Sequence, residues 1–190
     1  KEYFHTQAYT WCVHLAYLIF SGMGFPKDSI RLRQHLDNEK AHYAIDAWDV
    51  EIHTRSFGWI ECCGVHDRGD YDLKRHQEYS GENLSVKVNK KPVVPNVLEI
   101  AFGVERPLYA LLDNAYAEDE ERVWLRFAPE VAPIQVAVFP LMGKDELMEP
   151  ALEIYEEINE SGLIVYFDKG GSIGRRYRRQ DEVGTPFCVT

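Results

Sequence analysis

Glu99 and Arg106 are the two charged side chains best placed for chemistry in the stretch VLEIAFGVERPLYALL. Side chains alternate between the two faces of a strand. The stretch therefore predicts one apolar core face, formed by Leu98, Ile100 and Phe102. Glu99 shares the other face with Ala101 and Gly103, which have almost no side chain. A single carboxylate above such a floor is suited to holding a small cation.

Arg106 follows in the first turn of a predicted helix, where unpaired backbone N–H groups already favour anions. Pro107 is tolerated there because the first-turn N–H has no partner within the helix. A simpler interpretation is that Glu99 and Arg106 form an ion pair at the edge of a core. These two residues alone favour that simpler interpretation.

Two other places carry candidate residues. Glu61 lies in the predicted strand GWIECCG, where taken alone it is an ordinary strand carboxylate. The segment KGGSIGRRYRRQ carries a basic cluster at Arg175, Arg176, Arg178 and Arg179. By itself this cluster indicates a solvated helix face. Lys169 lies just before it and is expected beside the same surface. Asp168 ends the preceding predicted strand and is expected beside that surface.

The composition limits the class of protein. The 190 residues are 45% hydrophobic and 13% aromatic, enough for one large or two small domains. The net charge of −10 argues against a protein that coats nucleic acid through bulk charge. Without a long apolar run or an apolar leader at the start, we expect a soluble, cytoplasmic protein and no membrane partner. The four cysteines are too irregular for a disulfide framework, and the histidines lack metal-ligand spacing.

The predicted elements of the first part are mostly helices and antiparallel strands. A helix is expected from Glu2 to about Ser21, and a strand over SIRLRQH. WDVEIHT and FGWIECCGV predict a hairpin, and Asp70 is expected to cap a polar helix over YDLKRHQEYS. The strand VLEIAFG and the helix VERPLYALLDNAY follow, and the acidic run AEDEER suggests a solvated boundary.

The pattern changes after about Arg126. IQVAVFPL, ELMEPALEIYEEINESG and LIVYFD predict strand, helix and strand in a parallel unit. A further helix over GSIGRRYRRQDEVG and a strand over PFCVT follow. The fold class is therefore α/β (α+β), with domains expected at 1–126 and 127–190.

The string EIAFGVERPLYALL resembles motif 3 of the class II aminoacyl-tRNA synthetases, a strand ending in glycine followed by a helix that opens with Glu-Arg. IRLRQHLDNEKAHYAIDAWDVEI and GWIECCGVHDRGDYDLKRH are similar to further pieces of the glycyl-tRNA synthetase catalytic domain of the archaeal and eukaryotic kind. APIQVAVFPL and GGSIGRRYRRQDEVGTPFCVT resemble its anticodon-binding domain. The resemblance covers nearly the whole chain. It implies a partial class II antiparallel sheet with helices, followed by a mixed-sheet α/β domain.

The resemblance also implies roles for single residues. Arg106 corresponds to an arginine that grips the ATP phosphates, and Glu61 to a residue that contacts ATP and helps hold Mg²⁺, with a backbone contact from Cys62. Glu99 corresponds to the residue that binds the glycine ammonium in a segment commonly written E-x-S, so Glu99, Ile100 and Ala101 are the expected glycine-binding residues. Ala101 replaces the usual hydroxyl, and a lost hydrogen bond to a charged group is worth about 1.5–3 kcal/mol. The basic cluster and Lys169 are expected to bind tRNA.

The implied function is ATP-dependent activation of glycine and its transfer to tRNA(Gly), by a protein that is a homodimer at full length. Motifs 1 and 2 are expected before Lys1, so this portion alone is expected to be inactive. The connection SGENLSVKVNKKPVV looks shorter than the insertion often found there. One alternative is a non-catalytic, synthetase-like RNA-binding or accessory protein. Another is a synthetase for a related small amino acid, alanine or serine.

Overall fold

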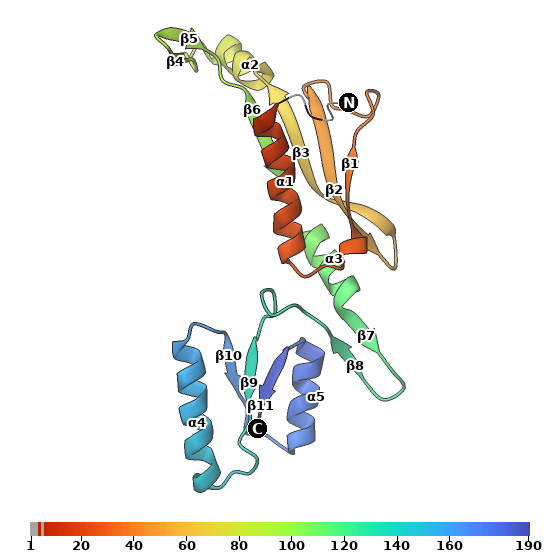
Figure 1. Ribbon diagram of the computed structural model, residues 1–190, viewed down its shortest axis with the longest axis vertical. Coiled ribbons are helices and arrows are strands. Elements are labelled where there is room, and N and C mark those ends of the chain that lie inside the picture. The colour runs from red at the N-terminus through yellow and green to blue at the C-terminus, as the bar shows by residue number, and fades with distance from the viewer. Residues whose placement is uncertain (1–3, 5) are drawn as a thin grey trace. The chain divides into compact units, whose positions relative to one another are not determined.

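The computed structural model describes Phe4 and residues 6–190, so the predicted helical start at Glu2 lies outside the described part. The chain divides into two compact units, Lys1–Ala110 and Leu111–Thr190. The division falls inside helix α3, Glu105–Ala115. The domain boundary that the sequence predicts, between residues 126 and 127, stays a prediction. Figure 1 shows the elements of each unit.

A four-stranded antiparallel sheet forms the centre of the first unit, in the order β1-β2-β3-β6. The strands are β1 (Ile30–Gln34), β2 (Asp46–Thr54), β3 (Gly58–Gly69) and β6 (Val97–Ala101). They confirm the predicted hairpin and the predicted strand around Glu99. A short 3₁₀ turn, Lys27–Ser29, precedes β1.

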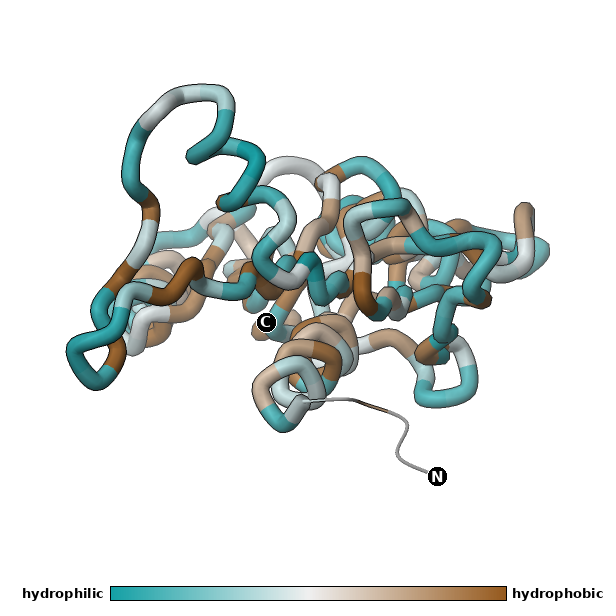
Figure 2. Tube along the Cα trace, turned by 90° about the horizontal axis from the view of Figure 1, so that it is seen from above, coloured by the Kyte–Doolittle hydropathy of each residue, from teal (hydrophilic) through white to brown (hydrophobic). Residues whose placement is uncertain are grey.

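Helix α1 (Gln7–Gly22) covers one face of this sheet. Thr6 caps the helix by accepting a hydrogen bond from the Tyr9 N–H at 3.1 Å. The buried face of α1 is formed by Tyr9, Val13, Ala16 and Phe20, and Figure 2 shows the helix mostly in the colours of apolar residues. The Tyr9 hydroxyl donates to the Val65 carbonyl at 2.7 Å, which ties α1 to β3.

Two smaller elements follow the central strands. Helix α2 (Tyr71–Ser80) begins after Asp70, as predicted, but the Asp70 carboxylate makes an ion pair with Lys74 at 2.6 Å and no capping hydrogen bond. The polar connection then forms a hairpin of β4 (Val86–Val88) and β5 (Lys91–Val93). The turn of that hairpin places Asn89 and Lys90 at positive φ.

The second unit contains the predicted parallel sheet, in the order β10-β9-β11. Its elements are β9 (Val136–Val138), α4 (Asp145–Glu160), β10 (Val165–Phe167), α5 (Ile173–Val183) and β11 (Phe187–Val189). Helix α4 packs on the sheet through Ala151, Tyr155 and Ile158, against Val136 and Val138. Figure 1 shows α4 and α5 flanking the three strands. The parallel strand-helix-strand prediction is confirmed.

The acidic run AEDEER, predicted to be a solvated boundary, is exposed after Ala117 and forms part of a hairpin. Its first two residues end strand β7 (Tyr116–Glu118), the next four form the turn, and β8 (Val123–Leu125) follows and pairs antiparallel with β7. The Asp119 carboxylate accepts the N–H groups of Glu121 and Arg122 at 2.9 Å, which explains why an acidic run makes a tight turn. Within Phe4 and residues 6–190, no helix has the length and apolar character needed to cross a membrane.

Candidate functional site

Glu61 and Arg106 meet at the end of the central sheet, as the expected nucleotide site requires. An Arg106 Nη1 donates to the Glu61 carbonyl oxygen at 3.2 Å and lies 3.3 Å from its Oε2. Both belong to a cavity of about 390 Å³ lined by Glu61, Cys62, Ala101, Phe102, Gly103, Glu105 and Arg106. The three residues predicted for ATP therefore line one cavity with Ala101.

The Arg106 guanidinium is available to an incoming anion. Its side chain is 63% exposed and that of Glu61 is 50% exposed, and such an exposed ion pair holds its partners weakly. Arg106 also lies in the first turn of α3, where the helix presents unpaired N–H groups. The cavity thus combines two features that favour phosphate.

The carboxylates of this cavity fit Mg²⁺. Glu61 and Glu105 both line it, and a Cβ added at Gly103 would lie 3.1 Å from Glu105 Oε2, so that carboxylate rests against the glycine. Mg²⁺ is usually held by one or two carboxylates, with phosphate oxygens and water completing its shell. In the described part of the chain, no group of three or more His, Cys, Asp or Glu side chains is arranged to hold a metal alone. Glu61 and Glu105 therefore suit an ion that arrives with a nucleotide.

A β-bulge explains why Glu61 faces this cavity. Val50 pairs with Cys63 but Glu51 pairs with Glu61, so β3 contains one extra residue, Cys62, at this point. The extra residue brings Glu61 to the same face as Gly64, which simple alternation would not do.

The thiols of Cys62 and Cys63 are both buried, and burial raises the pKa of Cys62 to about 11 and that of Cys63 to about 12. Neither thiol is a nucleophile at neutral pH.

Glu99 is held by two cationic or protonatable partners. His66 Nδ1 lies 2.8 Å from Glu99 Oε1, and an Arg68 Nη1 donates to Oε2 at 2.6 Å. The Glu99 side chain is 30% exposed, which agrees with its predicted place on the face opposite the core residues. Glu99 and Arg106 do not form the ion pair that the simpler interpretation required, because Glu99 pairs with Arg68 and Arg106 pairs with Glu61.

The other predicted glycine contact, Ile100, lies on the opposite face. It pairs with Val65, whose side chain is fully buried on the face that α1 covers. Only the backbone of Ile100 can face the polar side of the sheet. Phe102, predicted to be core, is 49% exposed, although its ring lies edge-on to Phe20 with centroids 5.9 Å apart.

A floor of small residues lies beside Glu99. Gly64 pairs directly with Ala101, and the next pair on the same face is His66 with Glu99. Ala101 and Glu99 were predicted from the sequence, whereas Gly64, His66 and Arg68 were not. The alternation of these three residues in GVHDR was a usable signal, since they share one face of the strand that pairs with Glu99.

The basic cluster of the second unit divides into buried and exposed members. Arg176 is 4% exposed and donates to the carbonyl oxygens of Pro140, Asp168 and Gly171. Gly171 has φ of +77°, a conformation that glycine adopts without strain and that turns its carbonyl toward Arg176. Arg176 therefore ties loops together. The RNA contact predicted for it does not fit, because its guanidinium is covered.

Arg179 is committed to Asp168. Its guanidinium pairs with the Asp168 carboxylate and donates to the Gly170 carbonyl oxygen at 2.8 Å. Burial opposes ionisation of Asp168, but the hydrogen bonds from Arg179 and the Gly170 N–H outweigh burial and lower the pKa of the carboxyl. Lys169 and Arg175 are exposed and remain candidates for contacting tRNA.

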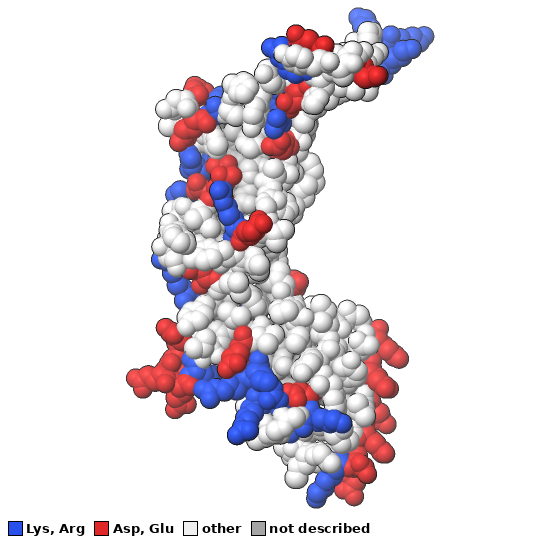
Figure 3. Space-filling model, turned by 180° about the vertical axis from the view of Figure 1, so that it is seen from behind, with Lys and Arg blue, Asp and Glu red and all other residues white. Residues whose placement is uncertain are grey.

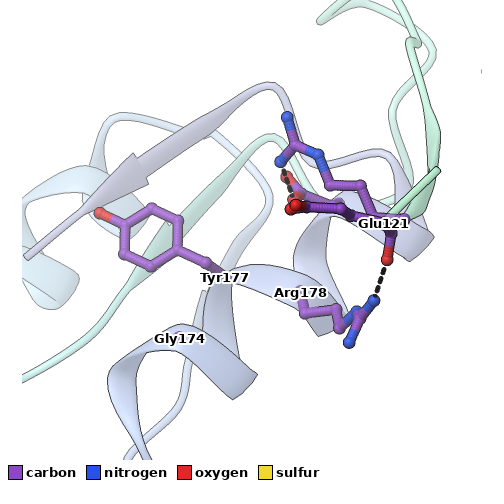
Figure 4. A pocket seen from close by; sticks show the side chains of 6 residues that line it. Glu121, Gly174, Tyr177 and Arg178 are labelled. Atoms are coloured by element: carbon purple, nitrogen blue, oxygen red, sulfur yellow. Dashed lines mark hydrogen bonds and ion pairs between the residues drawn. The ribbon is translucent and has the colours of Figure 1, made fainter. Parts of the chain in front are cut away.

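Arg178 borders a polar cavity of about 420 Å³ between the β7–β8 turn and α5 (Figure 4). It donates to the Glu121 carbonyl oxygen, and Arg122 pairs with Asp181 at 2.9 Å. The ring of Tyr177 lines the same cavity. Figure 3 shows the basic side chains of this unit gathered apart from the acidic side chains of α4, so a polyanion would meet the α5 side.

Comparison with known proteins decides the family. Residues 135–190 match the family model described as an anticodon binding domain. The glycine–tRNA ligase of Methanocaldococcus jannaschii is 34% identical over 265 aligned residues, covering 97% of this chain and 46% of that protein. The chain belongs to the glycine–tRNA ligase family.

Further glycine–tRNA ligases show the same extent of similarity. That of Thermococcus gammatolerans is 32% identical, covering 100% of this chain and 47% of the relative. That of Methanothrix thermoacetophila is 37% identical, covering 88% and 42%. The chain spans about half the length of the curated relatives it matches. The alignments with the first two relatives run over 265 and 267 positions against 190 residues, so these glycine–tRNA ligases carry internal segments that the chain lacks.

Proposed function

We propose that this chain is the part of a glycine–tRNA ligase that holds the glycine ammonium and the ATP phosphates. The observation that carries the proposal is the shared face of the sheet: Glu99 lies beside the Gly64–Ala101 floor, and Ala101 lines the cavity of Glu61 and Arg106. A small amine and a nucleotide can therefore bind side by side. The Arg68 guanidinium lies next to Glu99 and can pair with the carboxylate of the bound glycine.

In the proposed reaction, the glycine carboxylate attacks the α-phosphorus of ATP and pyrophosphate leaves. The nucleophile is already ionised, so this step needs no general base. The protein contributes position, through Glu99 and Arg106, and charge neutralisation at the phosphates. Bound Mg²⁺, held by Glu61 and Glu105, would neutralise further phosphate charge. The glycyl group then passes to the terminal ribose of tRNA(Gly).

ATP–pyrophosphate exchange by the full-length protein tests this function, using glycine, alanine and serine in parallel. Exchange with glycine alone, followed by charging of tRNA, supports the proposal. Exchange with alanine or serine instead would assign the site to another small amino acid. Absence of exchange with all three would favour the non-catalytic RNA-binding alternative, which the missing hydroxyl at Ala101 makes worth testing.

We also propose that the full-length protein is a cytoplasmic homodimer. Measurement of its size in solution tests the dimer, and cell fractionation tests the location.

Arg175→Ala should weaken tRNA binding and reduce its salt dependence. Arg175 is exposed near the start of α5, and each lost phosphate contact lowers the slope of log K against log salt by about 1. Binding of tRNA measured between low and moderate salt checks this. Lys144→Ala is the matched control, because Lys144 is exposed in the same unit beside the acidic helix α4. An unchanged slope for Arg175→Ala would remove this residue from the tRNA surface.

A further inference from the structure

Gly64 and Ala101 are neighbouring parts of the floor beside Glu99, but only Ala101 is open. Gly64 is buried, whereas Ala101 is exposed and lines the cavity of about 390 Å³. The imidazole of His66 accounts for the difference. A Cβ added at Gly64 would lie 2.7 Å from His66 Cε1, so the ring stands directly over the glycine. A substrate on this floor therefore lies over Ala101, beside the imidazole.

The imidazole of His66 is held by two neighbours. Its Nδ1 lies 2.8 Å from Glu99 Oε1, and its ring lies edge-on to the His35 ring with centroids 6.3 Å apart. The His35 ring is held in turn, because its Nε2 lies 2.7 Å from the carboxylate of Asp49, a residue that is only 3% exposed. A ring fixed by a hydrogen bond and packed against a second fixed ring does not yield space at low cost. His66 therefore forms a rigid boundary of the floor.

The sheet leaves open space on one side of this ring. Gly64 of β3 is flanked by Asp49 of β2 and by Ala101 of β6. On the β2 side, the buried Asp49 carboxylate and the His35 ring close the space. On the β6 side, Ala101 is exposed. The imidazole of His66 therefore separates a filled part of this face from the part proposed to hold the amino acid.

An ammonium can reach Glu99 while the imidazole stays in place. Glu99 Oε1 is bonded to His66, and Oε2 accepts a hydrogen bond from Arg68. An ionised carboxylate has about four lone-pair sites, so each oxygen keeps a second site for another donor. The Glu99 side chain is also 30% exposed, which leaves it accessible from the open side. The amino acid then lies against the ring instead of displacing it.

We propose that the imidazole of His66 is a wall that excludes amino acids with a β-carbon from the site. The inference rests on the proposed function and adds a specificity-determining residue to it. An amino acid whose ammonium pairs with Glu99 has its α-carbon over Ala101, because Ala101 joins the face of Glu99 to the nucleotide cavity. Glycine has no substituent at that carbon. The β-carbon of alanine or serine would press on the imidazole beside it or on the Ala101 methyl group below it.

Two variants of His66 separate the wall from the hydrogen bond to Glu99. His66→Ala removes both. His66→Asn removes most of the ring but keeps an amide N–H that can donate to Glu99 from the place of Nδ1. Pyrophosphate exchange by the full-length protein, with glycine, alanine and serine, gives kcat/KM for each amino acid. The ratio of kcat/KM for alanine to that for glycine should rise about tenfold or more in both variants, which is the discrimination that one carbon atom allows.

The matched control is His76→Ala. His76 is an exposed histidine of α2, and its removal should leave the ratio of alanine to glycine unchanged. KM for ATP is measured in the same assays. It should stay within about twofold of the unaltered protein in both His66 variants, which shows that the nucleotide cavity has kept its shape.

A raised ratio in both His66 variants supports the proposal. An unchanged ratio in both overturns it, while glycine-dependent exchange by the unaltered protein leaves the proposed function intact. A ratio raised in His66→Ala alone also overturns it, because the effect would then come from the hydrogen bond to Glu99. Loss of exchange with all three amino acids in both variants overturns it as well, since that pattern indicates a structural role. An unaltered protein that does not prefer glycine overturns both the wall and the proposed function.

Discussion

Glu99→Gln in the full-length protein should abolish glycine-dependent pyrophosphate exchange. The substitution keeps the shape of the side chain but removes its negative charge beside the Gly64–Ala101 floor. Truncating one partner of a hydrogen-bonded charge pair costs about 2–5 kcal/mol, which is between about 30-fold and several thousand-fold. The measurement is exchange at saturating ATP over a wide range of glycine concentration.

The control for this variant is Glu78→Gln. Glu78 is an exposed glutamate of α2 that pairs with Arg75 at 2.6 Å, away from the proposed site, and its loss should leave exchange unchanged. Binding of ATP to Glu99→Gln, followed separately, reports whether the nucleotide cavity has survived. Near-normal exchange by Glu99→Gln, with intact ATP binding, would remove Glu99 from ammonium recognition.

Arg176→Ala should destabilise the second unit, in contrast to the RNA-binding role that the basic cluster predicted. The guanidinium is buried on three backbone carbonyl oxygens, and its Nε is itself buried without a partner among the described residues. Removing it leaves carbonyl groups unsatisfied, and losses of this kind cost about 3–5 kcal/mol. Native-state hydrogen exchange of the amides in β9 and β11 measures the effect, since local opening exposes them.

Arg175→Ala is the matched variant for that experiment. It removes an exposed guanidinium one position earlier on the same helix, so amide protection of β9 and β11 should not change. We expect opposite effects from the two variants: Arg176→Ala loses stability, and Arg175→Ala loses tRNA affinity. Unchanged protection in Arg176→Ala, together with weakened tRNA binding, would show that Arg176 faces RNA.

Local patterns were enough to predict most of the elements. The alternation around Glu99 lies within one segment, and that segment forms strand β6. The helical spacing of ELMEPALEIYEEINESG also lies within one segment, which forms helix α4. A local pattern likewise placed Arg106 correctly in the first turn of α3. The hairpin β7–β8 was missed because its signal is divided between two strands of three residues, on either side of an acidic turn.

The parts of the site that were missed depend on pairing between strands. Alternation alone would put Glu61 and Gly64 on opposite faces, and only the extra residue at Cys62 brings them together. His66 joins the site because its register is with Glu99, which lies 33 residues later. Likewise, the burial of Arg176 depends on carbonyl groups from two separate loops, so composition predicted a charged surface where the fold has a buried cation.

A crystal structure of the full-length protein with a stable glycyl-adenylate analogue would show directly whether Glu99 and Arg106 hold the two ends of the intermediate. We expect the analogue's ammonium within about 2.7–3.2 Å of the Glu99 carboxylate, with its phosphate facing the Arg106 guanidinium. An analogue bound elsewhere, or one that leaves Glu99 on His66 and Arg68 and Arg106 on Glu61 with no contact to either, would contradict it.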